Sequence, residues 1–196
     1  MGQLLVAVLA SLWGVFGVSS VSKVISPKRR HAFAGALRAL RLFPDSFVAP
    51  VAVGVSGLES AIAVGLAAAL GGVVAEASWA VWTATVALLV VMTLLGVLTA
   101  GIVLALRRRT TAPCACFGPS ERPLSWRHVL RNGLMLLVGV AGAAIAVFAR
   151  PVVADLASAG LAGAVGVIIA AVLIRLDEIV ELFTPTGLAG RARARS

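Results

Sequence analysis

Residues 81–106 read VWTATVALLVVMTLLGVLTAGIVLAL and contain no charged side chain. A helix formed by such a run is long enough to cross the hydrocarbon layer of a membrane, which is about 30 Å thick. The run stops at Arg107-Arg108-Arg109, a triplet that marks a firm boundary with water. The stretch therefore predicts a membrane-spanning helix.

The composition of the whole chain agrees with this prediction. Of its 196 residues, 60% are hydrophobic and only 13% are charged, which leaves too few polar residues to cover a soluble domain. The net charge of +9 could suggest a nucleic-acid partner, but no soluble basic face with interleaved aromatic residues accompanies it. We therefore expect the lipid bilayer to be a partner and nucleic acid not to be one.

Four further apolar stretches predict spans: Gln3–Ile25, Val48–Val74, Val129–Phe148 and Leu156–Ile174. No Lys or Arg precedes the first stretch, so we interpret it as a retained helix and not as a secretory signal. The predicted fold class is all-α, a polytopic membrane bundle of four core helices and a fifth. Residues 1–183 are expected to form one transmembrane domain, and residues 184–196 a basic, disordered cytoplasmic tail.

A basic segment separates the first two spans. Pro27 suits a helix start and Pro44 a helix end, and apolar residues recur between them at helical spacing (Phe33, Leu37 and Leu40). Arg38 and Arg41 fall on a different face. The pattern predicts a short amphipathic helix along the membrane surface. The alternative is a solvated basic loop that fixes only the topology.

The distribution of cations predicts the orientation. Six of the 17 Lys and Arg residues lie between Lys23 and Arg41, six between Arg107 and Arg131, and four from Arg175 onward, which leaves only Arg150. Cations concentrate in cytoplasmic loops. We therefore expect a multi-pass protein of the inner or plasma membrane with its N-terminus outside and its C-terminus in the cytoplasm.

Glu59 lies near the middle of the second predicted span. A carboxyl group at that depth is costly, so we expect it to face the bundle interior, protonated or hydrogen-bonded. It could act as a proton relay or as a polar contact beside a reactive site. It could equally form a hydrogen bond that holds helices together.

Both cysteines of the chain lie in Pro-Cys-Ala-Cys-Phe-Gly-Pro, residues 113–119, within a loop predicted to be cytoplasmic. Thiols there are kept reduced, so a structural disulfide is not expected. A bond between Cys114 and Cys116 would close a small ring that is easily reduced, and the surrounding arginines favour the reactive thiolate. The pattern favours a redox-active pair over two inert buried thiols.

Several of these motifs occur together in one known family. They are Arg-Leu-Phe-Pro at 41–44, Glu59, Cys-Ala-Cys-Phe-Gly at 114–118 and Leu-Ser-Trp-Arg-His-Val-Leu-Arg-Asn at 124–132. From Leu4 to Phe148 the chain resembles the MauE branch of the MauE/DoxX membrane proteins. The resemblance implies a helical membrane bundle associated with thiol–disulfide chemistry. MauE proteins are linked to methylamine utilisation, where they are thought to help mature a disulfide-rich dehydrogenase subunit beside a thioredoxin-like protein.

The resemblance implies that Cys114 and Cys116 are the redox pair and that Glu59 is the intramembrane acid. We predict these three residues as the catalytic ones and a thioredoxin-like protein as the partner. The presumed clients of the family are exported, whereas the charges predict a cytoplasmic pair. Either the pair moves between faces, or a quinone or another protein supplies a second redox station.

Three functions follow from these residues. The first is a membrane thiol–disulfide oxidoreductase, in which one cysteine attacks a partner disulfide and the other resolves the intermediate. The second is a soft-metal binding protein or transporter, although His31 and His128 have no ligand spacing that recommends them. The third is a non-catalytic scaffold for a redox partner. No sequence feature requires a cofactor, and a quinone is compatible with the chain.

Overall fold

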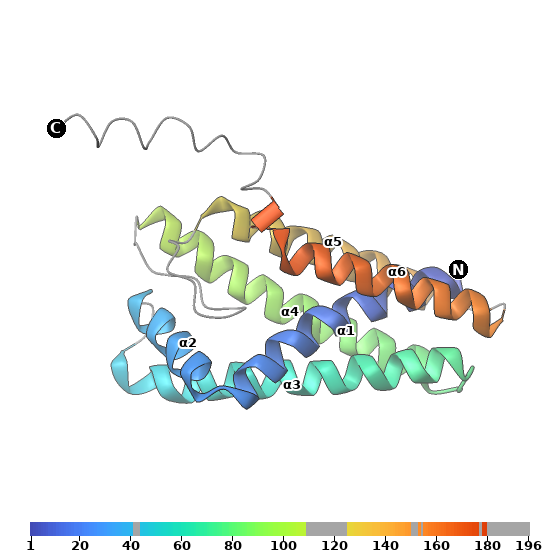
Figure 1. Ribbon diagram of the computed structural model, residues 1–196, viewed down its shortest axis with the longest axis horizontal. Coiled ribbons are helices and arrows are strands. Elements are labelled where there is room, and N and C mark those ends of the chain that lie inside the picture. Colours follow the sequence, from blue (N-terminus) through green and yellow to red (C-terminus); the bar gives the residue numbers. More distant parts are fainter. Residues whose placement is uncertain (41–43, 109–124, 150–152, 154, 177, 180–196) are drawn as a thin grey trace.

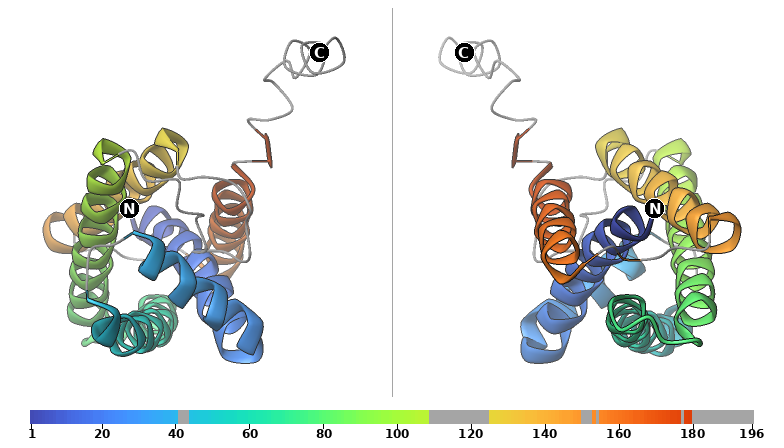
Figure 2. Two further views of the ribbon diagram at one scale, coloured as in Figure 1. Left: turned by 90° about the vertical axis from the view of Figure 1, so that its left-hand side faces the viewer. Right: turned by 90° about the vertical axis from the view of Figure 1, so that its right-hand side faces the viewer.

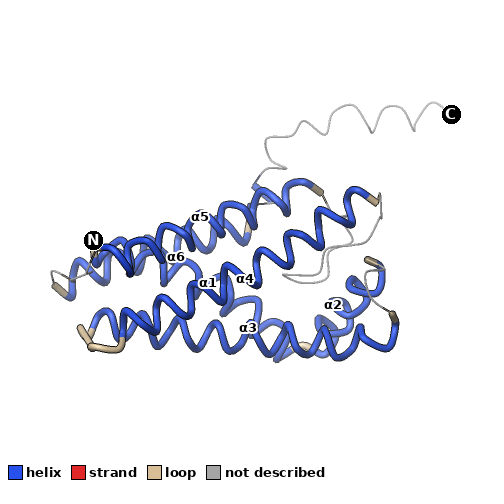
Figure 3. Tube along the Cα trace, turned by 180° about the vertical axis from the view of Figure 1, so that it is seen from behind, coloured by secondary structure: helices blue, strands red, loops and turns tan. Residues whose placement is uncertain are grey.

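The computed structural model describes residues 1–40, 44–108, 125–149, 153, 155–176 and 178–179. This part of the chain is helical, without strands (Figures 1 and 3). Its helices are α1 (Gly2–Ile25), α2 (Pro27–Ala39), α3 (Asp45–Val74), α4 (Ala80–Arg107), α5 (Trp126–Phe148) and α6 (Leu156–Ile174). All except α2 are long and apolar enough to cross a membrane. The predicted all-α membrane bundle with five spans is confirmed.

Two helices begin three residues earlier than the hydropathy pattern predicts. Helix α3 begins at Asp45, directly after Pro44, and a carboxylate in the first turn suits the positive end of the helix dipole. Helix α5 begins at Trp126 because Ser125 and His128 form a capping box there. These polar residues extend each helix beyond the apolar stretch that the sequence identifies.

Helix α1 is the central helix of the bundle. In its most apolar window 56% of the residues are buried, against 22% or 33% in the other spans. It packs against α6 on one side and against α3 and α5 on the other, as the end-on views of Figure 2 show. Helix α6 follows α5 in the sequence but makes its main contacts with α1. The bundle is therefore built around its first helix.

Small residues allow α1 and α6 to approach closely. A Cβ atom added to Gly14 would lie 2.7 Å from the Cβ of Ala170, and one added to Gly166 would overlap the carbonyl oxygen of Ala7. Larger side chains would separate the two backbones. The glycine and alanine content of the fifth span therefore has the packing role that its composition predicts.

The amphipathic helix α2 packs its apolar side on protein. Phe33, Ala36 and Leu37 are buried against Val48 and Ala52 of α3. The helix starts at Pro27 after Ser26, whose Oγ accepts a hydrogen bond from the backbone N–H of Arg29. The helix was predicted, but its contact with α3 was not, because the amphipathic pattern alone does not distinguish a lipid surface from a protein surface.

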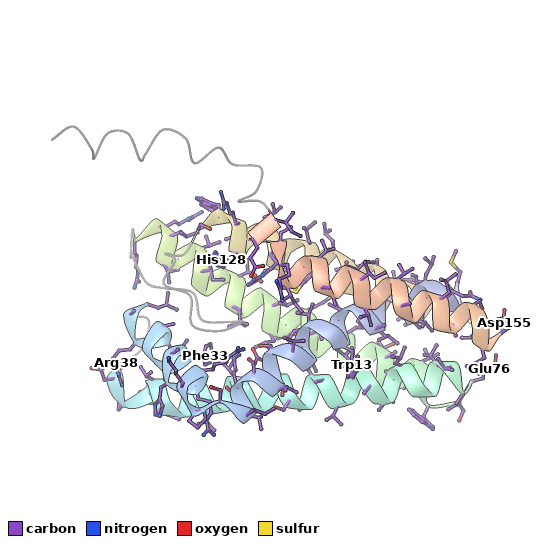
Figure 4. All side chains as sticks on the ribbon, in the orientation of Figure 1. Trp13, Phe33, Arg38, Glu76, His128 and Asp155 are labelled. Atoms are coloured by element: carbon purple, nitrogen blue, oxygen red, sulfur yellow. The ribbon has the colours of Figure 1, made fainter. Side chains whose placement is uncertain are left out.

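The two ends of the bundle differ in charge. One end carries α2, the last turn of α4 and the start of α5, and we call it the basic end; Arg38 and His128 lie there (Figure 4). Glu76 and Asp155 lie at the opposite end. Residues 109–124 and 180–196 lie outside the described residues, so the predicted boundary of the tail at 184 stays a prediction.

Candidate functional site

A buried ion pair lies in the half of the bundle nearer the basic end. Lys23, near the end of α1, and Glu59, in the middle of α3, are only 2% and 5% exposed. The Lys23 Nζ donates a hydrogen bond to the Glu59 Oε2 and forms a salt bridge with it. A single charge at this depth is costly, and pairing two opposite charges lowers that cost.

Serine side chains add further polar contacts to the pair. The Ser19 Oγ donates to the Glu59 Oε2 at 3.2 Å and accepts from the Lys23 Nζ at 3.3 Å. Ser19 and Lys23 reach the same carboxylate because residues four apart share one face of a helix. Ser20 and Ser60 directly follow Ser19 and Glu59 in the sequence, and their hydroxyls lie 2.7 Å apart, which ties α1 to α3 beside the pair.

Helix α2 covers the ammonium group of Lys23. The Lys23 Nζ lies 4.3 Å from the centroid of the Phe33 ring, within the range of a cation–π interaction. Figure 4 shows Phe33 on α2 beside the end of α1. The contact of α2 with α3 therefore also shields the ion pair.

Helix α5 contributes a second group of buried polar residues. His128, Arg131 and Asn132 are all buried, and their spacing places them on one face of the helix. The His128 Nδ1 lies 3.2 Å from the Ser125 Oγ at the helix start. Arg131 and Asn132 line the same small cavity as Ser19 and Glu59. The site thus combines polar side chains from α1, α3 and α5.

Of the three predicted site residues, the structure describes Glu59 but not the two cysteines. Glu59 faces the bundle interior and is hydrogen-bonded, as its position predicts; its catalytic role stays a prediction. Cys114 and Cys116 lie outside the described residues. The segment that carries them joins Arg108 after α4 to Ser125 before α5, and both of these anchors are at the basic end.

Lys23 was assigned only to the basic segment in the sequence, although it is the charged partner of Glu59. The signal was present, because a lysine inside an apolar span needs a partner as much as a glutamate does. Arg131 and Asn132 were similarly assigned to the start of the fourth predicted span, and their burial inside the bundle was not predicted. Their spacing with Met135, Gly139 and Gly142 marks the buried face of α5.

The described residues contain no group of three or more His, Cys, Asp or Glu side chains that could hold a metal ion. His31 is exposed on α2 and His128 is part of the helix cap. In the described part of the chain the two histidines therefore lie in different local environments.

The fold and the buried polar cluster define a class of protein: a multi-pass helical membrane protein with an ion pair inside its bundle. The model of the family described as methylamine utilisation protein MauE matches residues 1–148, and the chain belongs to this family. The predicted family is thus confirmed. No curated protein and no solved structure matches the chain. The matched region includes Lys23, Glu59 and both cysteines, whereas α6 follows it.

Proposed function

We propose that the protein is a membrane thiol–disulfide oxidoreductase in which Cys114 and Cys116 exchange electrons with a thioredoxin-like partner. The observation that carries the proposal is the buried Lys23–Glu59 pair in the half of the bundle nearer the basic end. The cysteine-bearing segment starts and finishes at that end, with Cys114 six residues after Arg108 and Cys116 nine before Ser125. Membership of the MauE family also supports the proposed thiol–disulfide function.

The reaction transfers two electrons. A thiolate on one cysteine attacks a disulfide sulfur of the partner, which forms a mixed disulfide and releases a partner thiolate. The other cysteine then attacks the mixed disulfide. The pair ends as a disulfide and the partner as a dithiol, with the two protons passing from one dithiol to the other. The steps can run in either direction.

The buried charges supply an environment suited to this chemistry. Cationic side chains favour a thiolate over a thiol, and Lys23 and Arg131 are buried in the basic half. In this proposal Glu59 is the intramembrane acid that exchanges protons at the site, and Lys23 positions its carboxylate. We further propose that the basic end faces the cytoplasm, and that a quinone or a second protein supplies the next redox station.

Single Cys114→Ser and Cys116→Ser variants test the proposal, because each leaves one thiol in a chain that has only two cysteines. One variant should accumulate a mixed disulfide with a thioredoxin-like protein, visible as a band shift that reductant reverses. The cysteine-free double variant is the matched control. Undiminished exchange in both single variants would remove the proposal, and a bound thiophilic metal in purified protein would favour metal handling.

A scaffold role is the second candidate, and a groove between α3 and α4 favours it. The groove has a volume of about 480 Å³ and contains Ala61, Gly65 and Trp82. Gly57 precedes Ala61 by one turn on the same face of α3, and a Cβ added to Gly57 would meet no atom within 4 Å. Small residues of this kind let a partner helix approach closely. A scaffold would keep its partner in the cysteine-free variant and lose it in Gly57→Leu.

A further inference from the structure

A small cavity lies where α1, α3, α4 and α5 meet. Its volume is about 30 Å³. Ser19, Glu59, Arg131 and Asn132 are its polar lining residues, and the side chains that α4 contributes, Leu95 and Leu98, are apolar. The cavity therefore combines a polar wall with an apolar one inside the bundle.

Asn132 and Glu59 each present a polar group for which the described part of the chain supplies no hydrogen-bond partner. Asn132 is 5% exposed, and no described residue hydrogen-bonds its carboxamide. Glu59 uses only Oε2 to accept from Ser19 and Lys23, which leaves Oε1 without a partner among the described side chains. Buried polar groups are nearly always hydrogen-bonded, to protein or to ordered water. Both groups line the same cavity.

The volume of the cavity limits which molecule can hydrogen-bond to the Glu59 and Asn132 groups. A water molecule needs roughly 10–15 Å³ of such volume and two to four polar partners. The cavity of about 30 Å³ meets the first condition, and the Glu59 and Asn132 groups meet the second. We propose that the cavity binds water that bridges the Glu59 Oε1 and the Asn132 carboxamide. This water links the acid of α3 to the polar face of α5.

The bound water also gives Glu59 a route for proton exchange. Arg131 and His128 continue the buried polar face of α5 from Asn132 toward Ser125, over about 10 Å at the rise of an α-helix. A proton passed through this water to the carboxylate leaves the water neutral and the carboxyl group protonated, and the reverse transfer restores the carboxylate. The buried charged or titratable groups near the proposed route are Lys23 from α1 and Arg131 and His128 from α5. Asn132 is a positioning residue for the water.

The inference stands apart from the thiol chemistry, because neither cysteine takes part in it. Water-edited solid-state NMR of the full chain in liposomes, with ¹³C-labelled glutamate, measures magnetisation transfer from water to each carboxyl carbon. Glu59→Gln assigns the Glu59 signal. We expect transfer to Glu59 in the native chain, slowed at least about threefold in Asn132→Leu because that change removes a polar partner of the water.

Two further variants make the test specific. Leu98→Phe fills the cavity from its apolar wall and leaves every polar group in place, so it should slow the transfer as well. Ser60→Ala removes a hydrogen bond beside Glu59 without touching the cavity and should leave the transfer unchanged. Absence of transfer in the native chain would overturn the proposal. Unchanged transfer in Leu98→Phe would also overturn it, even if Asn132→Leu fails to fold.

Discussion

At the scale of single residues, Lys23 and Glu59 set the energetics of the site. Each is almost fully buried, and each is the charged partner of the other. Removing one partner leaves the other as a buried charge without compensation, which is destabilising. Replacing both partners by apolar residues of similar size leaves no buried charge, so it costs much less. We therefore expect the pair as a whole to add little to net stability.

Breaking the pair should be costlier than removing it. We expect Lys23→Met or Glu59→Gln to lower the free energy of unfolding by about 3 kcal/mol, and the Lys23→Met/Glu59→Leu double variant to lose much less. Reversible unfolding in mixed micelles measures these differences, with Ser60→Ala as a control that costs about 1 kcal/mol or less. Additive losses in the double variant would show that the two charges are not coupled.

Asp155 gives the bundle a pH-dependent contribution at the end opposite α2. Its carboxylate accepts the backbone N–H of Ser158 at 2.8 Å and caps α6. This backbone hydrogen bond, with a further contribution from the Ser158 hydroxyl, lowers the pKa of Asp155 below its ordinary value of 3.8. Because the pKa is lowered in the folded state, the ionised carboxylate stabilises the fold at pH values above the ordinary pKa. That stabilisation is lost as the pH falls through the lower pKa of the folded state.

We therefore expect the thermal midpoint of the native chain to fall more steeply than that of Asp155→Asn as the pH drops from about 6 to about 3. Differential scanning calorimetry of detergent-solubilised protein compares the two. Parallel pH profiles would mean that the cap does not contribute to stability.

The inward orientation of Glu59 could be predicted from the sequence, because a lone acid in an apolar span has few alternatives. Its pairing with Lys23 could not be read from the same pattern. Lys23 lies two residues before the end of α1, where a cation also suits the headgroup region and the helix dipole. In the structure the Lys23 side chain lies on the same face of α1 as Ser19 and reaches Glu59 on α3.

At the scale of elements, the α1–α6 interface depends on the absence of side chains. A Cβ on Gly166 would overlap backbone of α1, which cannot move aside as a flexible side chain could. On the same helix, a Cβ on Gly163 would meet nothing within 4 Å. These two glycines form a matched pair for a packing test.

Gly166→Ala should destabilise the bundle by about 1–3 kcal/mol, the usual cost of inserting volume into a packed interface. Gly163→Ala should be neutral or slightly stabilising, since alanine is the better helix former. Unfolding in mixed micelles compares the two variants. Equal effects would contradict the close approach of α1 and α6.

The elements themselves were largely predictable. Residues 156–174 form α6 as predicted, and the other spans differ by no more than three residues at either end, because hydropathy over about 20 residues reports a helix long enough to cross a membrane. The neighbours of each helix were not predictable. Helix α6 packs on α1 because Gly166 and Gly14 each lie against small residues of the other helix. A hydropathy pattern does not show which helices will be neighbours.

At the scale of the whole molecule, the bundle separates its charges by end. The connections at α2 and between α4 and α5 are at the basic end, and the cysteine-bearing segment belongs to the second of them. The positive-inside rule predicts that this end faces the cytoplasm. The buried ion pair, the cavity and the start of α5 all lie in the same half.

The most direct test of the redox proposal is the state and accessibility of Cys114 and Cys116 in intact membranes. A membrane-impermeant thiol reagent is applied from each side before and after mild reductant, with the cysteine-free variant as the blank. We predict labelling from the cytoplasmic side that increases after reduction. Thiols whose labelling stays unchanged across a broad range of redox poise would contradict the proposal that the pair is a redox centre.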